Sequence, residues 1–301
     1  MSSRTPADAA DISDRAAEHG LDIDASTISI IEAGLDFRVA IAQAADGTRW
    51  VLRMPRRADV VERATVEGRL LRAVAPLLSV RVPDWQIVSD RLIAYPLLPG
   101  MPGLTLDDSG APVWSYDPTS SVYATSLGEL LAELHAIEPS EVRGTGIDVL
   151  SPSDVREKWR ADIDTVSAEF EVAPQTNSRW HAWLADDTFW PDWSVLTHGE
   201  IYPAHTLLDG ERITAVLDWT TAEIGDPSKD FAFQQAFASP EAFDLTVRTY
   251  VENGGRVWPR LADHCSERFA ASPIGYGLFA LMTGDEQHRS TAAELLNPAS
   301  E

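Results

Sequence analysis

The chain of 301 residues is long enough for one large core or two modest lobes, and its 44% apolar content is typical of a globular protein. It carries 24 Lys and Arg against 47 Asp and Glu, so its formal net charge is −23. This charge repels DNA, RNA and anionic lipid and favours cationic solutes, which argues against a nucleic-acid-binding or membrane-surface protein.

The cysteine content and residues 1–20 indicate in which cellular compartment we expect the protein. Cys265 is the single cysteine, which rules out an internal disulfide framework and is typical of a reducing environment. Residues 1–20 carry acidic residues where a signal peptide needs an apolar segment, and no later stretch approaches a membrane span of about 20 apolar residues. We therefore expect a soluble, cytoplasmic protein, and we expect a monomer.

The first hundred residues predict a small α+β lobe. Residues 28–51 alternate apolar and polar side chains around Gly34 and an Asp46-Gly47 turn, which indicates antiparallel strands. Residues 59–78 show helical spacing, and residues 92–98 read as one more buried strand.

The remaining two thirds predict a mostly helical lobe. Residues 101–121 are rich in Pro, Gly, Ser and Asp and indicate a linker or flap, so the boundary is placed near Gly100, between lobes 1–100 and 101–301. Helical spacing recurs at residues 121–137, 153–170, 177–187 and 240–254 and in a last pair of helices within 258–296. Strands at 205–210 and 212–219 interrupt this half, with Asp209-Gly210 as the hairpin turn between them.

That hairpin makes Glu200, His205 and Asp218 candidates for a reaction centre. A hairpin holds its ends together, so two carboxylates and an imidazole can reach one point, as metal-assisted phosphoryl transfer requires. A zinc site that pairs His205 with His198 is the alternative, but zinc needs three or four suitably spaced ligands and Cys265 is far along the chain. We interpret His198 as fixing the loop, and Asp226 and Asp230 together as residues that cap the next helix and brace the loop by hydrogen bonds.

Several ordered motifs carry a resemblance to a known family. Residues 198–219, HGEIYPAHTLLDGERITAVLDW, resemble the HGD…N…IDW signature of the aminoglycoside phosphotransferase family. A His in place of the usual Asn, followed by WTTAEIGDPSKDFA, is similar to the macrolide 2′-phosphotransferases within it. The stretches GLDFRVAIA, RWVLRMPRRA, VPDW and GGRVWPRLA resemble that subfamily too, so the likeness spans nearly the whole chain.

The resemblance implies a protein-kinase-like, two-lobed α+β fold and a reaction. The γ-phosphate of GTP, or of ATP, would pass to the 2′-hydroxyl of the amino sugar of a macrolide, with GTP favoured as the donor. Glu200 would be the general base, and His205 and Asp218 would bind Mg²⁺. Arg53 would hold the nucleotide phosphates in place of the strand lysine of protein kinases, paired with Glu67 on the following helix. The only lysines are Lys158 and Lys229, so a phosphate clamp in the N-terminal half must use arginine.

The same resemblance places the nucleotide and the acceptor. Gly34 would lie in the loop over the nucleotide, and Tyr95, Leu97 and Leu98 in the hinge that binds the purine. Apolar side chains near and after the metal loop are candidates for the macrolide wall, although each one equally fits plain core packing. They are Tyr202, Trp219, Phe233, Phe237, Tyr276, Phe279 and Met282.

Glu200 departs from the family pattern, which usually has Asp at this position. The extra methylene moves the carboxylate by about 1.5 Å. Because the other candidate residues are in place, we expect an active kinase. The alternatives are a kinase of the same fold for another alcohol, such as an aminoglycoside, a choline-like amine or a sugar, and a nucleotide-binding pseudokinase.

Overall fold

The computed structural model describes residues 6–32, 36–107 and 109–298, which form two compact units. Unit 1 comprises Met1–Asp117, Ser140–Ile147 and Pro203–Thr221, and unit 2 comprises Pro118–Pro139, Asp148–Tyr202 and Ala222–Glu301. This division differs from a single cut near Gly100, because two later segments of the chain return to unit 1.

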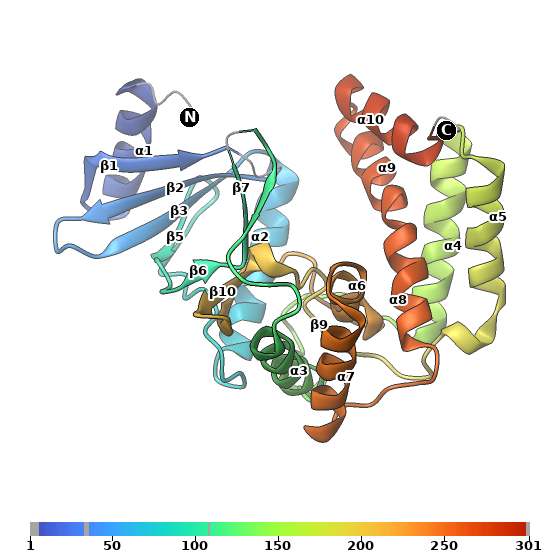
Figure 1. Ribbon diagram of the computed structural model, residues 1–301. Helices are drawn as coiled ribbons and strands as arrows, with labels where there is room; N and C mark the ends of the chain where they lie inside the picture. The colour runs from blue at the N-terminus through green and yellow to red at the C-terminus, as the bar shows by residue number, and fades with distance from the viewer. Residues whose placement is uncertain (1–5, 33–35, 108, 299–301) are drawn as a thin grey trace. The chain divides into compact units, whose positions relative to one another are not determined.

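Unit 1 is built on a five-stranded antiparallel sheet (Figure 1). The strand order is β1-β2-β3-β5-β4, with β1 Ile23–Ile31, β2 Phe37–Ala44, β3 Arg49–Pro55, β4 Ile87–Val88 and β5 Ile93–Pro96. The predicted turn between β2 and β3 is confirmed: Gly47 has φ 88°, and the backbone N–H of Ala44 donates to the carbonyl of Thr48 at 2.8 Å.

One helix packs on each face of this sheet, because alternate strand residues point to opposite faces. α1 (Pro6–Glu18) packs through Ile12 against residues such as Leu52 of β3. α2 (Ala58–Val74) is the helix predicted at residues 59–78, and its Ala64 packs against the other face. No part of the sequence interpretation predicted α1.

Unit 1 also contains the predicted hairpin between His205 and Asp218 and the short strands near it. A three-stranded sheet has the order β11-β10-β6, and β7 pairs with β8. Their bounds are β6 Met101–Pro102, β7 Leu104–Leu106, β8 Pro112–Trp114, β10 Thr206–Asp209 and β11 Arg212–Val216, with a 3-10 turn η2 at Pro203–His205. Short strands therefore occupy much of the region predicted as a linker or flap.

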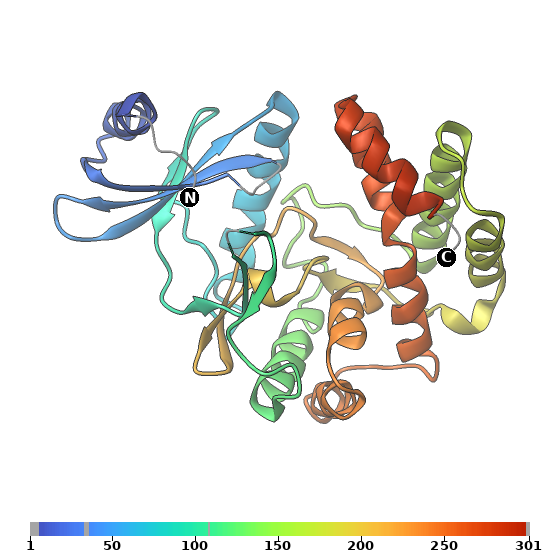
Figure 2. The ribbon, with the colours of Figure 1, turned by 45° about the horizontal axis from the view of Figure 1, so that its top comes forward.

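Unit 2 is mostly helical, and α4, α5, α9 and α10 lie together in it (Figure 2). Its helices are α3 Ser121–His135, α4 Pro152–Glu169, α5 Pro174–Ala185, α6 Ser228–Phe237, α7 Pro240–Glu252, α8 Leu261–Ala270, α9 Ser272–Thr283 and α10 Glu286–Leu296, with a 3-10 turn η1 at Asp187–Phe189. Two short strands, β9 (Val195–Thr197) and β12 (Glu223–Gly225), pair antiparallel, and β9 ends just before the loop that carries Glu200. The antiparallel sheet and the helical unit confirm the predicted two-lobed α+β fold.

The predicted pair of helices within residues 258–296 was wrong, since the structure has three there. Gly284, at φ 64°, ends α9 in the left-handed conformation. The side chain of Asp285 then caps α10 by accepting from the backbone N–H groups of Gln287 and His288.

In the part of the chain that the structure describes, no helix combines the length and the apolar character needed to cross a membrane.

Candidate active site

A buried ion pair joins the central strand of unit 1 to its main helix. Arg53 on β3 donates from Nη1 to both carboxylate oxygens of Glu67 on α2, at 3.0 and 3.3 Å. Only 7% of the Arg53 side chain and none of the Glu67 side chain is exposed. The predicted pairing of Arg53 with Glu67 is confirmed.

The electrostatics of this pair depend on both partners. Burial alone would lower the pKa of Arg53, but the charges of Glu67, Tyr95 and Asp218 and the hydrogen bond to Glu67 together hold that pKa above its usual value. Burial raises the pKa of Glu67, and Arg53 opposes the rise. Removal of either partner would leave a charge buried without compensation.

Glu67 also fixes the backbone beside Asp218, the predicted metal ligand. Its Oε1 accepts a hydrogen bond from the backbone N–H of Trp219 at 3.1 Å. The neighbouring Asp218 has φ 61°, and it is the only non-glycine residue with positive φ among those described. Thr220 Oγ1 donates to Asp218 Oδ1 at 2.6 Å. Strained backbone of this kind persists only where surrounding contacts hold it, and it is concentrated at functional sites.

The predicted hairpin brings His205 and Asp218 together. β10 and β11 pair antiparallel, Gly210 makes the turn with φ 60°, and the backbone N–H of Leu217 donates to the carbonyl of His205 at 2.8 Å. His205 Nε2 lies 3.9 Å from Asp218 Oδ2. No group of three or more His, Cys, Asp or Glu side chains in the described ranges could hold a metal ion. The Asp218 carboxylate with the His205 imidazole beside it fits Mg²⁺. This ion commonly takes one or two protein ligands and completes its shell with phosphates and water.

The segment predicted as the hinge begins within β5 at Tyr95 and continues past the end of that strand to Leu98. Tyr95 is buried, and burial raises the pKa of its phenol to about 12. The backbone N–H of Leu97 donates to the carbonyl of Arg49 at 2.7 Å, and Leu98 is half-buried. Gly34, predicted to lie over the nucleotide, is outside the described residues.

Unit 2 carries the loop with the predicted base. Glu200 is exposed, and its backbone N–H donates to Nδ1 of His198 at 3.2 Å. His198 is wholly buried, in keeping with its interpretation as a residue that fixes the loop.

Asp230 of α6 holds the backbone of the same loop. Its two carboxylate oxygens accept from the backbone N–H groups of His198 at 3.0 Å and Gly199 at 2.7 Å. His135 on α3 lies 3.2 Å from Asp230 through Nε2 and 2.9 Å from the hydroxyl of Tyr250 through Nδ1. Burial would raise the pKa of Asp230, but these contacts hold it below its usual value. Asp230 thus braces the loop, which is one of the two roles predicted for Asp226 and Asp230 together.

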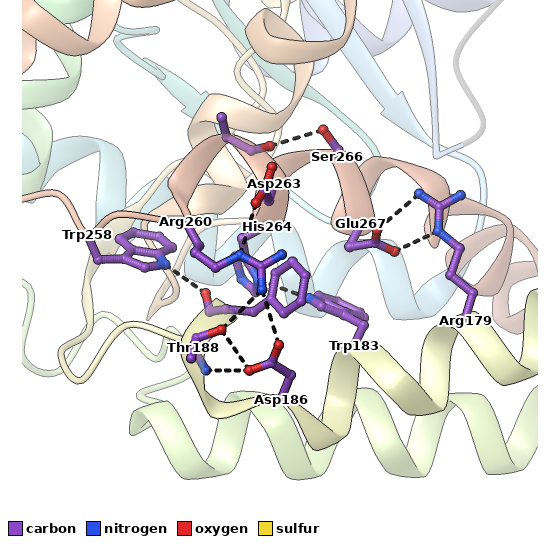
Figure 3. A network of polar contacts seen from close by, with 12 residues as sticks. Arg179, Trp183, Asp186, Thr188, Trp258, Arg260, Asp263, His264, Ser266 and Glu267 are labelled. Atoms are coloured by element: carbon purple, nitrogen blue, oxygen red, sulfur yellow. Dashed lines mark hydrogen bonds and ion pairs between the residues drawn. The ribbon is translucent and has the colours of Figure 1, made fainter.

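Asp226 stands at the start of α6, where its Oδ1 accepts from the backbone N–H of Ser228 at 2.9 Å. Its Oδ2 lies 2.7 Å from Nε2 of His264 and 3.0 Å from Nη1 of Arg268. Trp183 Nε1 can only donate, and it does so to His264 Nδ1 at 3.0 Å (Figure 3). His264 therefore carries its proton on Nε2 and donates to Asp226. Although burial opposes it, these contacts keep the pKa of Asp226 below its usual value.

Aromatic rings form a row from Tyr202, two residues after Glu200, across α6 and α8 of unit 2. Tyr202 lies 5.1 Å from Phe233 between ring centroids, Phe233 stacks on Phe237 at 4.4 Å, and Phe237 meets Phe269 at 5.3 Å. Phe237 is 46% exposed and Phe269 38%. The sequence interpretation missed Phe269, because only the packing of α8 on α6 brings it to this row.

The other predicted wall residues lie in two places. Tyr276 and Phe279 share α9 with Met282, which is exposed, and the hydroxyl of Tyr276 lies 2.8 Å from Nδ1 of His288. Trp219 is almost wholly buried in unit 1, and its indole N–H donates to the carbonyl of Val216 at 3.2 Å. The side chain of Trp219 is thus part of the protein interior.

The candidate residues are distributed over the two units. Arg53, Glu67, His205 and Asp218 belong to unit 1, whereas Glu200 belongs to unit 2, and the chain passes from unit 2 to unit 1 between Tyr202 and Pro203. The structure therefore places the residues predicted to bind the nucleotide phosphates and the metal in one unit, and the convergence of Glu200 with them stays a prediction.

A strand cation paired to a helix carboxylate, in a sheet unit joined to a helical unit, defines the kinase-like class of phosphotransferases. The chain belongs to the phosphotransferase enzyme family, whose sequence pattern matches residues 27–264.

Individual relatives match almost the full length. The macrolide 2′-phosphotransferase MphH from Brachybacterium faecium, solved as the apoenzyme, is 57% identical, with a TM-score of 0.92 over 98% of this chain and 100% of that one. A type I macrolide 2′-phosphotransferase is 38% identical, with a TM-score of 0.92 and full coverage of both chains. The uncharacterized protein YcbJ of Bacillus subtilis (strain 168) is 37% identical over 290 residues, 95% of each chain.

Proposed function

We propose that this protein is a macrolide kinase. It transfers the γ-phosphate of a nucleoside triphosphate, GTP by preference, to the 2′-hydroxyl of the amino sugar of a macrolide antibiotic and so inactivates the drug. The observation that carries the proposal is 57% identity to a macrolide 2′-phosphotransferase over nearly the whole chain, at a TM-score of 0.92.

The nucleotide site belongs to unit 1 in this proposal. Arg53, held by Glu67, donates to phosphate oxygens, and the hinge at Tyr95, Leu97 and Leu98 binds the purine, with Gly34 in the loop above it. Solved relatives with the same fold are complexes with GDP or ADP, which supports a nucleotide donor. Mg²⁺ held by Asp218 and His205 would neutralise charge on the transferred phosphate.

Glu200 activates the acceptor. Its carboxylate orients the 2′-hydroxyl and takes its proton while the hydroxyl oxygen bonds to the γ-phosphorus. The bond from that phosphorus to the bridging oxygen breaks, and the nucleoside diphosphate leaves with the electron pair. Asp230 and His198 hold the loop backbone, so the base is oriented before the substrate arrives.

The acceptor pocket combines apolar surface with negative charge. The exposed row from Tyr202 to Phe269, with Tyr276, Phe279 and Met282, offers rings and methyl groups to a large lactone. The net charge of −23 attracts the dimethylammonium group of the amino sugar. We further propose that the protein acts as a monomer in the cytoplasm, where nucleoside triphosphates are available; light scattering after size exclusion tests the monomer.

Mass spectrometry tests the proposal. The protein is incubated with erythromycin, Mg²⁺ and either GTP or ATP, and we expect the antibiotic to gain one phosphate, faster with GTP. A panel of aminoglycosides, choline and sugars serves as the control set of hydroxyl acceptors. Transfer to a panel member instead of erythromycin would assign the protein to another alcohol, and nucleotide binding with no transfer would make it a pseudokinase.

A further inference from the structure

The proposed function leaves Trp85, the last residue of the VPDW motif, without a role. Trp85 lies between α2 and β4, and its ring centroid is 5.4 Å from Cζ of Arg53. A second ring, that of Phe37 at the start of β2, lies 4.0 Å from the same atom. Two aromatic rings are therefore within cation–π distance of one buried guanidinium.

The Arg53 guanidinium has N–H donors beyond those that bind Glu67. Glu67 occupies only Nη1 of Arg53, and in the described ranges Nε and Nη2 have no hydrogen-bond partner. Neither of these nitrogens is among the fully buried unpaired atoms, so each keeps some exposed surface. Buried polar groups are nearly always satisfied, and donors left over in a buried cation indicate an acceptor such as phosphate oxygen.

The indole is built tightly into its position. A Cβ on Gly68 of α2 would lie 3.0 Å from Cε3 and 3.1 Å from Cζ3 of Trp85, so glycine gives the ring room between the helix and Arg53. The indole Nε1 is buried without a partner. In this position the Trp85 indole forgoes a hydrogen bond, which costs free energy. Such a cost is consistent with a role in holding the Arg53 guanidinium beside it.

We propose that Phe37 and Trp85 are positioning residues for the phosphate donor. Their rings hold the plane of the Arg53 guanidinium, with Nη1 on Glu67, so that Nε and Nη2 are oriented for phosphate oxygens. The inference rests on the proposed function in taking a nucleotide as the ligand.

A guanidinium suits this arrangement and an ammonium does not. Arginine is planar, stacks on aromatic faces and presents several donors in a fixed fork. The lysine ammonium is compact and its N–H donors rotate freely, so two flanking rings cannot fix the direction of those donors. Arg53→Lys is therefore not conservative here, although lysine is the usual residue at this position in kinases.

A double-mutant cycle on GTP affinity, measured by calorimetry with Mg²⁺ and no macrolide, tests the inference. We expect Phe37→Leu and Trp85→Leu each to weaken binding about 5–10-fold, because each removes one of the two rings that hold the guanidinium. Trp85→Phe keeps a ring and should recover most of the loss. In an Arg53→Lys background, we expect either leucine variant to weaken GTP binding by less than about a further twofold, because the guanidinium that the rings orient is absent.

Two further variants separate positioning from folding. Trp50→Leu removes an indole that packs on the opposite face of the sheet, and we expect GTP affinity to stay unchanged. Gly68→Ala favours the helical conformation but pushes against the Trp85 ring. We expect it to weaken GTP binding about 2–5-fold without lowering the melting temperature.

Equal GTP affinity in wild type, Phe37→Leu and Trp85→Leu would overturn the inference and leave the proposed kinase standing. The same losses with lysine at position 53 as with arginine would also overturn it, since the rings would then act on folding alone. A wild-type protein that binds no nucleotide would instead remove the proposed function and, with it, the ligand assumed here.

Discussion

At the scale of single residues, the exposed carboxylate of Glu200 extends from a backbone that Asp230 holds through two N–H groups. The side chain is one methylene longer than aspartate, about 1.5 Å in reach. Because the backbone is fixed, a change of side-chain length moves the carboxylate relative to the acceptor hydroxyl.

We expect Glu200→Gln to lower kcat by about 10²–10⁴, the usual contribution of a general base. Glu200→Asp should lower kcat by up to about 10²-fold, as a displacement of about 1 Å does. Single-turnover phosphorylation of erythromycin measures both, with GTP affinity expected to stay unchanged. Glu241→Gln, in the exposed first turn of α7, is the matched control. Wild-type kcat in the Gln variant would remove Glu200 from the role of base.

Asp226 makes stability depend on pH. Its folded pKa lies below the ordinary value, mainly through His264 and Arg268 against the opposing effect of burial. The unfolded chain therefore binds its proton more readily, and the stabilisation is complete above the unfolded pKa of about 3.9 and is lost as pH falls below it.

We expect the free energy of unfolding, from urea titrations between about pH 3 and 7, to fall steeply below about pH 4. Asp226→Asn should be less stable at neutral pH by about 3–5 kcal/mol, the effect of breaking a buried ion pair, and should show a flatter pH dependence. Asp244→Asn, at an exposed position of α7, should behave as wild type. An unchanged pH profile in Asp226→Asn would contradict the assignment.

At the scale of elements, α3 and α7 approach closely at Gly128. A Cβ there would lie 2.6 Å from the carbonyl oxygen of Thr246 and 2.8 Å from Cβ of Thr249. Thr246 Oγ1 also donates to the carbonyl of Ala124 on α3 at 3.1 Å. This contact supports the two helices that supply Tyr250 and His135 to the Asp230 network.

We expect Gly128→Ala to destabilise the protein by about 1–3 kcal/mol, because overpacking outweighs the better helix propensity of alanine. Gly275→Ala on α9 is the matched control, since nothing lies within 4 Å of its added Cβ, and it should be neutral or stabilising by up to about 1 kcal/mol. Thermal and urea unfolding compare them. A Gly128→Ala variant as stable as Gly275→Ala would show that the helices separate easily.

At the scale of the whole molecule, the net charge of −23 opposes compaction by self-repulsion. Salt screens this repulsion: the Debye length is about 30 Å at 0.01 M and about 8 Å at 0.15 M. Buried pairs such as Arg53 with Glu67 are screened much less.

We therefore expect the melting temperature to rise by about 2–4 °C between these two salt concentrations, the shift that about 1 kcal/mol produces in domains of about 150–250 residues. Sodium and potassium chloride should act alike, because the effect depends on ionic strength. A fall in melting temperature with salt would mean that exposed ion pairs outweigh net repulsion.

The sequence by itself determined the local elements and the chemistry they carry. Strand alternation and the Asp-Gly turns at residues 46–47 and 209–210 predicted both hairpins, because turn geometry depends on a few neighbouring residues. The second hairpin in turn predicted that His205 and Asp218 meet, as they do at 3.9 Å. The family, and with it the two-lobed fold, followed from ordered motifs in the sequence.

Only the tertiary structure decided which distant residues share a network. The bond from Glu67 to the backbone of Trp219, the ring of Trp85 beside Arg53, and the contact of Phe237 with Phe269 join residues that are 152, 32 and 32 positions apart. Such contacts depend on how helices pack on the sheet and on each other, which local periodicity does not specify. The grouping of residues 203–221 with unit 1 has the same origin, because these residues join it through contacts with distant parts of the chain.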